Sequence, residues 1–282
     1  MRNPGDLIEI NGARLRVRIV GAGPAILLIH GWALDLDMWT PQLEAFASCY
    51  RCIAFDRRGF GLSSGTPGIE HDVNDIDALL VALHIGQVAI VGMSQGARVV
   101  LRWALRNPRR ASCIVLDGPP YEGLRSSDEL PEIPLVEFRA LARREGIEEV
   151  RGRWLEHPFM RLRANDAHAH ELLKTIVGRY PGRDLLVEEP LSPIADLRAL
   201  DIPALVVNGE HDSEHRRAAG GALASALANA RLALIPQAGH LPNLDNAPAY
   251  NESLKAFFAS QPSFAGSVSC RPSCNRSAHH AE

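Results

Sequence analysis

The residue best suited to chemistry in this sequence is a serine between two glycines. It stands in the run Gly92-Met93-Ser94-Gln95-Gly96, after the apolar stretch 88–91. So sharp a strand-to-helix turn strains the serine backbone, and side chains at the two glycine positions would collide with neighbouring chain. The hydroxyl is presented at a helix N-terminus, where backbone N–H groups can meet a developing oxyanion. Because a serine hydroxyl is a poor nucleophile at neutral pH, it needs a base within reach and an acid that orients the base.

The elements that would position these groups alternate between strand and helix. Continuous apolar runs are typical of strands covered on both faces, and segments with helical apolar spacing follow most of them. Asn11-Gly12 is a favoured hairpin turn and predicts an antiparallel pair at the start. The expected strands are 7–10, 15–20, 25–29, 52–55, 88–92, 111–116, 204–208 and 232–235, and the expected helices are 38–47, 73–83, 95–106, 216–227 and 249–259. This alternation predicts a doubly wound, mostly parallel α/β sheet of eight strands.

Polar residues stand directly after several of these strands. They are His30-Gly31-Trp32, Asp56, Ser94, Asp117, Asp212 and His240. In open α/β sheets, ligands bind outside the carboxyl ends of the strands. We therefore expect these residues to gather at one rim of the sheet.

From about Leu7 to Ala259 the sequence resembles the α/β-hydrolase family. The motifs that carry the resemblance are His30-Gly31-Trp32, Asp56-Arg57-Arg58-Gly59-Phe60-Gly61-Leu62-Ser63, Gly92-Met93-Ser94-Gln95-Gly96, Gly209-Glu210-His211-Asp212 and Gly239-His240. The chain order Ser94, Asp212, His240 is also the order used by that fold. The resemblance implies the α/β-hydrolase fold, a helical cap insertion and acyl-transfer chemistry.

The resemblance assigns a role to each residue of the predicted site. Ser94 is the nucleophile, His240 is the general base and later the acid, and Asp212 orients the imidazole and stabilises its cation. The backbone N–H groups of Trp32 and Gln95 form the oxyanion hole.

Asp117 is the alternative to Asp212 as the acid of the triad. It also ends a strand, and some members of the family place the acid there. Gly209-Glu210-His211-Asp212 has the family's spacing and favours Asp212, which leaves Asp117 a structural or pocket-lining role. His30, Asp56 and Arg57 are expected to hold their loops by hydrogen bonds.

The resemblance implies acyl transfer to water through a covalent acyl-enzyme, with no cofactor and no metal. The motifs are most similar to those of small esterases, enol-lactonases and cofactor-free haloperoxidases or perhydrolases. We predict a hydrolase that cleaves a small carboxylic ester or lactone. A carbon–carbon bond hydrolase, a perhydrolase and a hydrolase-fold small-molecule receptor or signalling protein are the alternatives. The expected substrate contacts are Trp32, Met93, Trp154, Phe159 and Leu241.

The predicted domain organisation has three parts. Residues 1–118 and 195–261 form the core, residues 119–194 form a helical cap (lid), and residues 262–282 form a disordered tail. The cap carries many arginines, and one of them could bind a substrate carboxylate in bidentate fashion, although solvated helix faces are the alternative. The arginines concerned are Arg139, Arg143, Arg144, Arg151, Arg153, Arg161 and Arg163.

Composition is ordinary for a soluble globular protein of 282 residues, with 46% hydrophobic and 22% charged residues. The net charge of −3 gives no indication of nucleic-acid or membrane binding. The start of the chain lacks the apolar core of a secretion signal, so we expect a cytoplasmic protein whose five cysteines are reduced. Cys270 and Cys274 could form a metal clip with His279-His280, but a disordered tail fits their surroundings better. The expected partner is a small acyl substrate, and the oligomeric state stays open, a homo-oligomer included.

Overall fold

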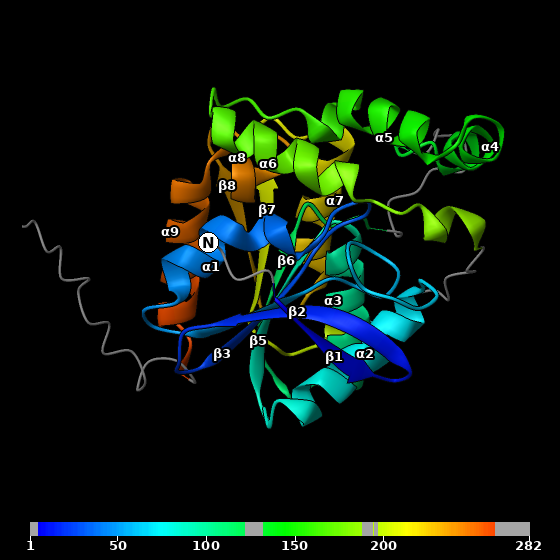
Figure 1. Cartoon of the computed structure of the whole chain (residues 1–282). Coiled ribbons are helices and arrows are strands. Elements are labelled where there is room, and N and C mark those ends of the chain that lie inside the picture. Colours follow the sequence, from blue (N-terminus) through cyan, green and yellow to red (C-terminus); the bar gives the residue numbers. More distant parts are fainter. Residues whose placement is uncertain (1–4, 122–131, 188–193, 195–196, 263–282) are drawn as a thin grey trace, which may run out of the picture.

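An eight-stranded sheet forms the centre of the protein in a computed structural model that describes residues 5–121, 132–187, 194 and 197–262. The strands are β1 (Asp6–Ile10), β2 (Ala13–Val20), β3 (Ala25–Ile29), β4 (Arg51–Phe55), β5 (Val88–Met93), β6 (Ala111–Asp117), β7 (Ala204–Gly209) and β8 (Ala230–Ile235). Their order across the sheet is β1-β2-β4-β3-β5-β6-β7-β8 (Figure 1). The β1–β2 and β2–β4 pairs are antiparallel, and all other neighbours are parallel. The predicted fold class is confirmed.

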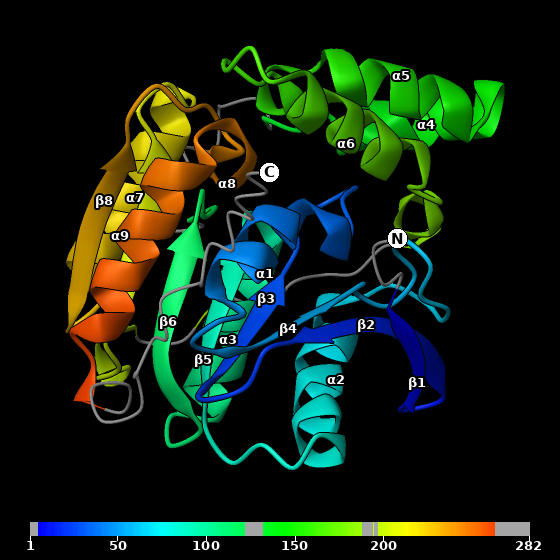
Figure 2. The same ribbon diagram turned by 60° about the vertical axis from the view of Figure 1, so that its left-hand side comes forward.

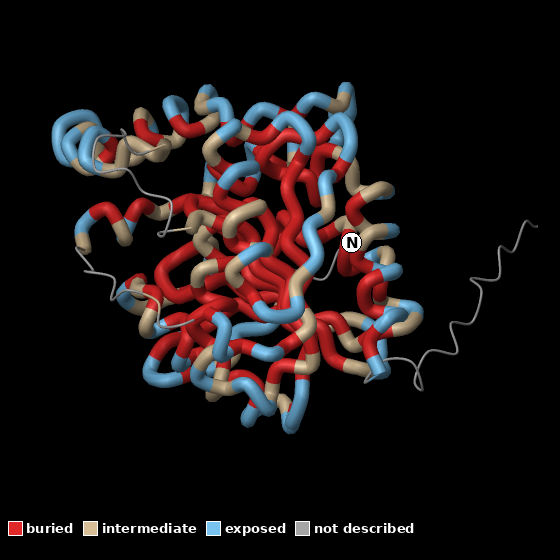
Figure 3. Tube along the Cα trace, turned by 180° about the vertical axis from the view of Figure 1, so that it is seen from behind, coloured by how far each residue is buried: buried red, intermediate tan, exposed pale blue. Residues whose placement is uncertain are grey.

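Helices cover both faces of the sheet, which explains the continuous apolar runs. The core helices are α1 (Thr40–Phe46), α2 (Ile69–Ala82), α3 (Gln95–Arg106), α7 (Glu214–Ala226), α8 (Pro242–Asp245) and α9 (Ala247–Ala259). Every residue of β3 is buried: Ile26 and Leu28 join the core shared with α1 and α9, whereas Leu27 and Ile29 join the core shared with α2 and α3. Figure 3 shows this buried centre as a continuous region inside exposed helix surfaces.

Two helix boundaries differ from the sequence prediction. The segment expected as one helix over 38–47 begins instead as a 3₁₀ turn, η1 (Leu36–Trp39), and continues as α1 with Pro41 in its first turn. Helix α2 begins at Ile69, four residues earlier than the apolar stripe indicated, because its first turn buries the aspartate Asp72 against the guanidinium of Arg57. Because a paired aspartate does not add to the apolar pattern, the spacing of apolar residues did not indicate this first turn of α2.

A second group of helices follows β6, and we call it the cap. It comprises α4 (Leu135–Glu145), α5 (Ile147–Glu156), η3 (Pro158–Met160), α6 (Ala167–Gly178) and η4 (Arg183–Leu186). Figure 2 shows α4, α5 and α6 as a layer above the end of the sheet toward which β5 and β6 point. A further turn, η5 (Leu197–Ala199), precedes β7. No strand occurs between β6 and β7 in the residues that the structure describes.

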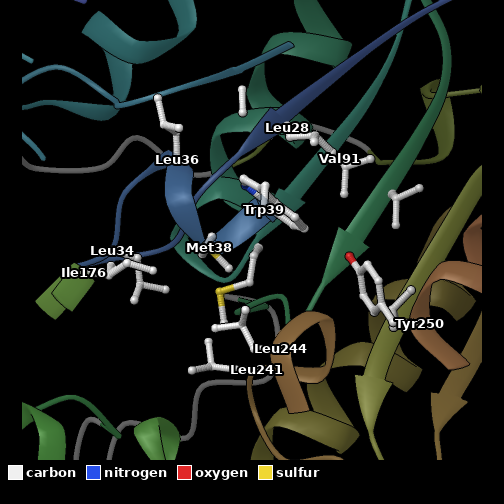
Figure 4. Close-up of a cluster of buried hydrophobic side chains, with 14 of the residues drawn as sticks. Leu28, Leu34, Leu36, Met38, Trp39, Val91, Ile176, Leu241, Leu244 and Tyr250 are labelled. Carbon is white, nitrogen blue, oxygen red and sulfur yellow. The ribbon is translucent and has the colours of Figure 1, made fainter. Parts of the chain in front are cut away.

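A continuous apolar cluster joins the sheet, η1 and the residues after β8 (Figure 4). Trp39 and Met38 of η1 lie between Leu28 of the sheet and Leu241 and Leu244 near α8, and all are buried. This packing fixes η1 and the loop before it against the core.

The cysteine prediction is correct only in part. Cys52 and Cys113 are free and buried, whereas Cys49 is disulfide-bonded, so the expectation of reduced thiols is wrong for Cys49. The tail, with its expected metal clip, falls outside the described residues. Within the described part of the chain, no helix is both long and apolar enough to cross a membrane.

Candidate active site

Ser94 occupies the sharp turn between β5 and α3. Its backbone has φ +50° and ψ −113°, a conformation that costs energy for a residue with a side chain and persists only where the surroundings enforce it. A Cβ on Gly92 would lie 2.4 Å from the carbonyl oxygen of Gly96, and one on Gly96 would lie 2.5 Å from that of Ile29. Both glycines are therefore required sterically, as the sequence indicated.

His240 and Asp212 form a buried hydrogen-bonded pair at the same rim. His240 follows β8, Asp212 follows β7, and the distance between His240 Nδ1 and Asp212 Oδ2 is 2.9 Å. The other carboxylate oxygen accepts a hydrogen bond from the backbone N–H of Ser213 at 2.8 Å. Burial alone would raise the pKa of Asp212, but the charge and hydrogen bond of His240, with the Ser213 N–H and the charge of Arg216, lower it. Asp212 is thus held as the carboxylate that orients the imidazole.

Ser94 and His240 meet at the segment that follows β6. The Ser94 N–H donates to the carbonyl of Asp117 at 2.7 Å, and a Cβ on the next residue, Gly118, would lie 2.9 Å from His240 Cε1. The Ser94 backbone and the His240 ring therefore both lie beside Asp117 and Gly118, and in the described residues no hydrogen bond joins the Ser94 hydroxyl to the ring. Catalytic hydrogen bonds often tighten only when substrate binds, so the arrangement is compatible with a base that acts on Ser94.

Asp117 is not the partner of His240. It is fully buried, and burial together with the nearby charge of Asp212 raises the pKa of its carboxyl well above the ordinary value, against a smaller opposing effect of the Tyr250 hydroxyl. Such a carboxyl takes up a proton more readily than an exposed aspartate. Of the two candidate acids, the structure therefore pairs Asp212 with the histidine.

The loop after β3, which carries Trp32, lies against Met93, the residue before Ser94. A Cβ on Gly31 would lie 2.6 Å from the sulfur of Met93, so a larger residue there would require the Met93 side chain to move. His30 Nε2 accepts the Arg57 N–H at 2.8 Å, and burial followed by the charge of Arg57 keeps the pKa of His30 well below its ordinary value. Within the described residues, neither the Trp32 N–H nor the Gln95 N–H donates a hydrogen bond to another group. Two such amides beside a nucleophile can receive an oxyanion.

Aromatic side chains of the cap cover the site. Phe159 of η3 stacks on the His240 ring with 4.0 Å between centroids, and Trp154 of α5 packs edge-on against Trp32 at 4.7 Å. The five residues predicted as substrate contacts (Trp32, Met93, Trp154, Phe159 and Leu241) are all buried in one apolar cluster. Of the five, Trp32 also lines a cavity.

Beside the predicted oxyanion residues is a cavity of about 140 Å³. Its lining includes Trp32 and Gln95 and three arginines, which are Arg57, Arg98 and Arg139. Arg57 is paired with Asp72 and donates to Gln95 Oε1 at 2.7 Å, whereas Arg139 comes from α4 of the cap and donates to the Val187 carbonyl at 3.1 Å. Of the arginines named from the sequence, Arg139 is the one that lines this cavity.

Two polar groups near the site had no sequence motif. Asp184 of η4 accepts the Trp32 indole N–H at 2.5 Å and the Tyr180 hydroxyl at 2.6 Å. Burial raises the pKa of Asp184, and the hydrogen bonds of Tyr180 and Trp32 oppose that rise. The contact with Trp32 joins residues 152 positions apart, so no local pattern could indicate it.

The second group is an ionic cluster between the cap and the core. Arg179, which ends α6, contacts Asp35 and Asp37 at 2.7 and 2.6 Å. Arg16 and Arg18 of β2 contact Asp37 at 2.9 and 2.6 Å. The cluster therefore joins the N-terminal hairpin, η1 and the cap.

Comparison with known proteins identifies the family of this chain. Residues 24–247 match the family model described as the alpha/beta hydrolase fold. The chain belongs to the α/β-hydrolase family. It is 28% identical over 272 residues to a non-heme haloperoxidase of Rhodococcus erythropolis, covering 89% of this chain and 97% of that protein.

Solved α/β-hydrolases share the architecture over nearly the whole chain. A thermophilic esterase from Thermogutta terrifontis is 25% identical with a TM-score of 0.76, covering 90% of this chain and 98% of that one. The enol-lactonase from Burkholderia xenovorans LB400 is 25% identical with a TM-score of 0.73, covering 89% and 99% of the two chains.

Proposed function

We propose that this α/β-hydrolase cleaves a small carboxylic ester or lactone through a covalent acyl-enzyme on Ser94. The observation that carries the proposal is the His240–Asp212 pair, 2.9 Å apart and adjacent to a nucleophile turn with two unengaged backbone N–H groups. Similarity to an esterase and to an enol-lactonase supports the same reaction class.

The proposed reaction begins when Ser94 Oγ attacks the carbonyl carbon and its proton passes to His240 Nε2. The tetrahedral oxyanion accepts hydrogen bonds from the Trp32 and Gln95 N–H groups, which exist before the charge develops and so need no reorganisation. Collapse breaks the ester C–O bond, and His240 returns the proton to the leaving alkoxide oxygen. Water then attacks the acyl-enzyme, again losing its proton to His240, and releases the acid and Ser94.

The surroundings of the site favour a small acyl group with a remote carboxylate. The stacked Phe159 and the buried Trp32, Trp154 and Leu241 limit the space over the triad. The cavity beside the oxyanion residues contributes Arg98 and Arg139, and a guanidinium binds a carboxylate through parallel charge-assisted hydrogen bonds.

Replacement of the nucleophile tests the reaction directly. Ser94→Ala is expected to abolish turnover of p-nitrophenyl acetate, while Ser225→Ala, an exposed serine of α7, retains it. A fluorophosphonate should label the wild type and the Ser225→Ala variant once per chain by mass spectrometry and leave Ser94→Ala unlabelled. Undiminished hydrolysis by a folded Ser94→Ala protein rejects the proposal. Sustained multiple turnover separates an enzyme from a receptor that reacts once.

A further inference from the structure

The Trp32 side chain, rather than only its backbone, is fixed by the cap. Its indole is 4% exposed and lies against Phe138, Trp154 and Tyr180, with centroid distances of 5.9, 4.7 and 5.4 Å. Within this apolar cluster the indole N–H donates to Asp184 Oδ2 at 2.5 Å. A buried indole N–H without an acceptor would lose its full hydration energy, so Asp184 determines where the ring can lie.

The backbone around Trp32 needs such a constraint. Ala33, the next residue, has φ +55° and is completely buried, a left-handed conformation that is uncommon for a residue with a Cβ. On the other side, Gly31 is pressed against Met93. Strained backbone of this kind persists only where neighbouring contacts enforce it. The Trp32 ring, buried in the cap and tied to Asp184, supplies contacts that hold the loop from outside the core.

Asp184 is itself positioned for this task. Its second oxygen accepts the Tyr180 hydroxyl at 2.6 Å, and Tyr180 packs against both Trp32 and Phe60. The carboxylate therefore has one oxygen committed to the cap and the other to the oxyanion loop. Asp184 also lines the cavity beside Trp32 and Gln95. In the described residues neither of its oxygens bonds to Ser94 or His240, and its hydrogen bond to the Trp32 indole is its link to the oxyanion loop.

We propose that Asp184 is a positioning residue, which by accepting the Trp32 indole N–H holds the Trp32 backbone N–H where it can receive the oxyanion. This inference rests on the proposed function of Ser94. It makes the oxyanion hole a joint product of the core loop and the cap, since one of its two donors is set by a cap carboxylate.

A double-mutant cycle tests the proposal with p-nitrophenyl acetate. Asp184→Ala is expected to lower kcat/KM about 10- to 100-fold, somewhat less than the loss of an entire oxyanion donor. Trp32→Phe, which removes the indole N–H but keeps the backbone N–H, is expected to lower it similarly. The double variant should be no slower than the slower single variant, because both changes remove the same bond. If Asp184→Ala does not fold, Trp32→Phe and Asp184→Asn carry the test.

Two controls separate positioning from general damage to the cap. Asp184→Asn keeps an acceptor for the indole and is expected to stay within about threefold of wild type. Arg179→Gln removes the ion pairs between the end of α6 and Asp35 and Asp37, away from Trp32 and Asp184; it should lower the urea midpoint while changing kcat/KM less than about threefold.

Affinity for phenylboronic acid, which forms a tetrahedral adduct with an active-site serine, should fall in Asp184→Ala by the same factor as kcat/KM. Wild-type kcat/KM in Asp184→Ala, additive losses in the double variant, or unchanged affinity for phenylboronic acid would each overturn the inference. These outcomes are distinct from failure of the proposed function, which is decided by Ser94→Ala alone. If Ser94 is required and Asp184→Ala is as active as wild type, only the positioning role is rejected.

Discussion

Phe159 lies nearly parallel to the imidazole of His240, with 24° between the two ring planes and 4.0 Å between their centroids. The guanidinium of Arg216 lies 5.1 Å from the centre of the same phenyl ring. A residue of the cap therefore covers one face of the proposed base, and we expect its size to limit the acyl group that the proposed site accepts.

Shortening this side chain should widen substrate preference. In Phe159→Ala, the ratio of kcat/KM for p-nitrophenyl octanoate to that for the acetate is expected to rise about tenfold or more, because added methylenes can be buried in the vacated space. Phe159→Leu should give an intermediate ratio. Steady-state kinetics on an acyl-chain series measures it, and an unchanged ratio in both variants would show that Phe159 does not limit the acyl site.

The two buried aspartates after β6 and β7 should differ sharply in their importance. Asp212→Asn is expected to lower kcat/KM for p-nitrophenyl acetate by roughly 10³- to 10⁴-fold, because the amide cannot hold the required imidazole tautomer. Asp117→Asn is isosteric with the protonated acid that burial favours and should stay within about threefold of wild type. Equal losses in the two variants would contradict the assignment of the acid.

Asp35 should make the free energy of unfolding depend on pH. Burial and the nearby charge of Asp56, opposed by Arg179, raise the pKa of Asp35 from 3.8 to about 7 in the folded protein, and Asp37 and Arg16 belong to the same cluster. Between about pH 4 and 7 the folded state binds more protons than the unfolded state, so the free energy of unfolding falls as pH rises.

Asp35→Asn removes this contribution. The melting temperature of the variant minus that of the wild type should therefore be several degrees more positive at pH 8 than at pH 5. For Asp201→Asn, at an exposed position, the difference in melting temperature from the wild type should be the same at pH 5 and pH 8. Scanning calorimetry at the two pH values decides the matter, and a difference of the opposite sign would be inconsistent with a raised pKa.

Arg139 should contribute to recognition of a substrate carboxylate. Arg139→Gln is expected to lower kcat/KM for mono-p-nitrophenyl succinate about tenfold, which is the typical effect of one charge-assisted hydrogen bond, and to leave p-nitrophenyl butyrate unaffected. Arg143→Gln, exposed on the same helix, is the matched control. Equal effects on the charged and the neutral ester would argue against a carboxylate site in the cavity.

The places of the predicted site residues in the fold could be predicted from sequence because they depend on local rules. Parallel strands place the residues after them at one rim, and the spacing of Gly92 and Gly96 predicts the sharp turn at Ser94. The choice between Asp117 and Asp212 needed geometry, since both follow buried strands. The distance between Asp212 and His240 settles which carboxyl faces the ring.

The contacts of the cap could not be predicted in the same way. Helical periodicity indicates that Phe138 or Trp154 is buried, but it does not say which surface buries it. Asp184 carries no motif, and its importance comes from the Trp32 indole, which meets it only through the tertiary fold. The same holds for Arg179, whose carboxylate partners lie more than 140 residues earlier in the chain.

Through the cluster of Arg16, Arg18, Asp37 and Arg179, the N-terminal hairpin also helps to hold the cap on the core. β2 lies toward the outer edge of the sheet, far along the chain from α6, yet its guanidinium groups hold the carboxylate that also anchors the end of that helix. Removal of residues 1–20 would therefore delete two strands and also remove the ion pairs through which Arg16 and Arg18 help to hold the cap. The attachment of the cap to the core therefore depends on two arginines of the N-terminal hairpin.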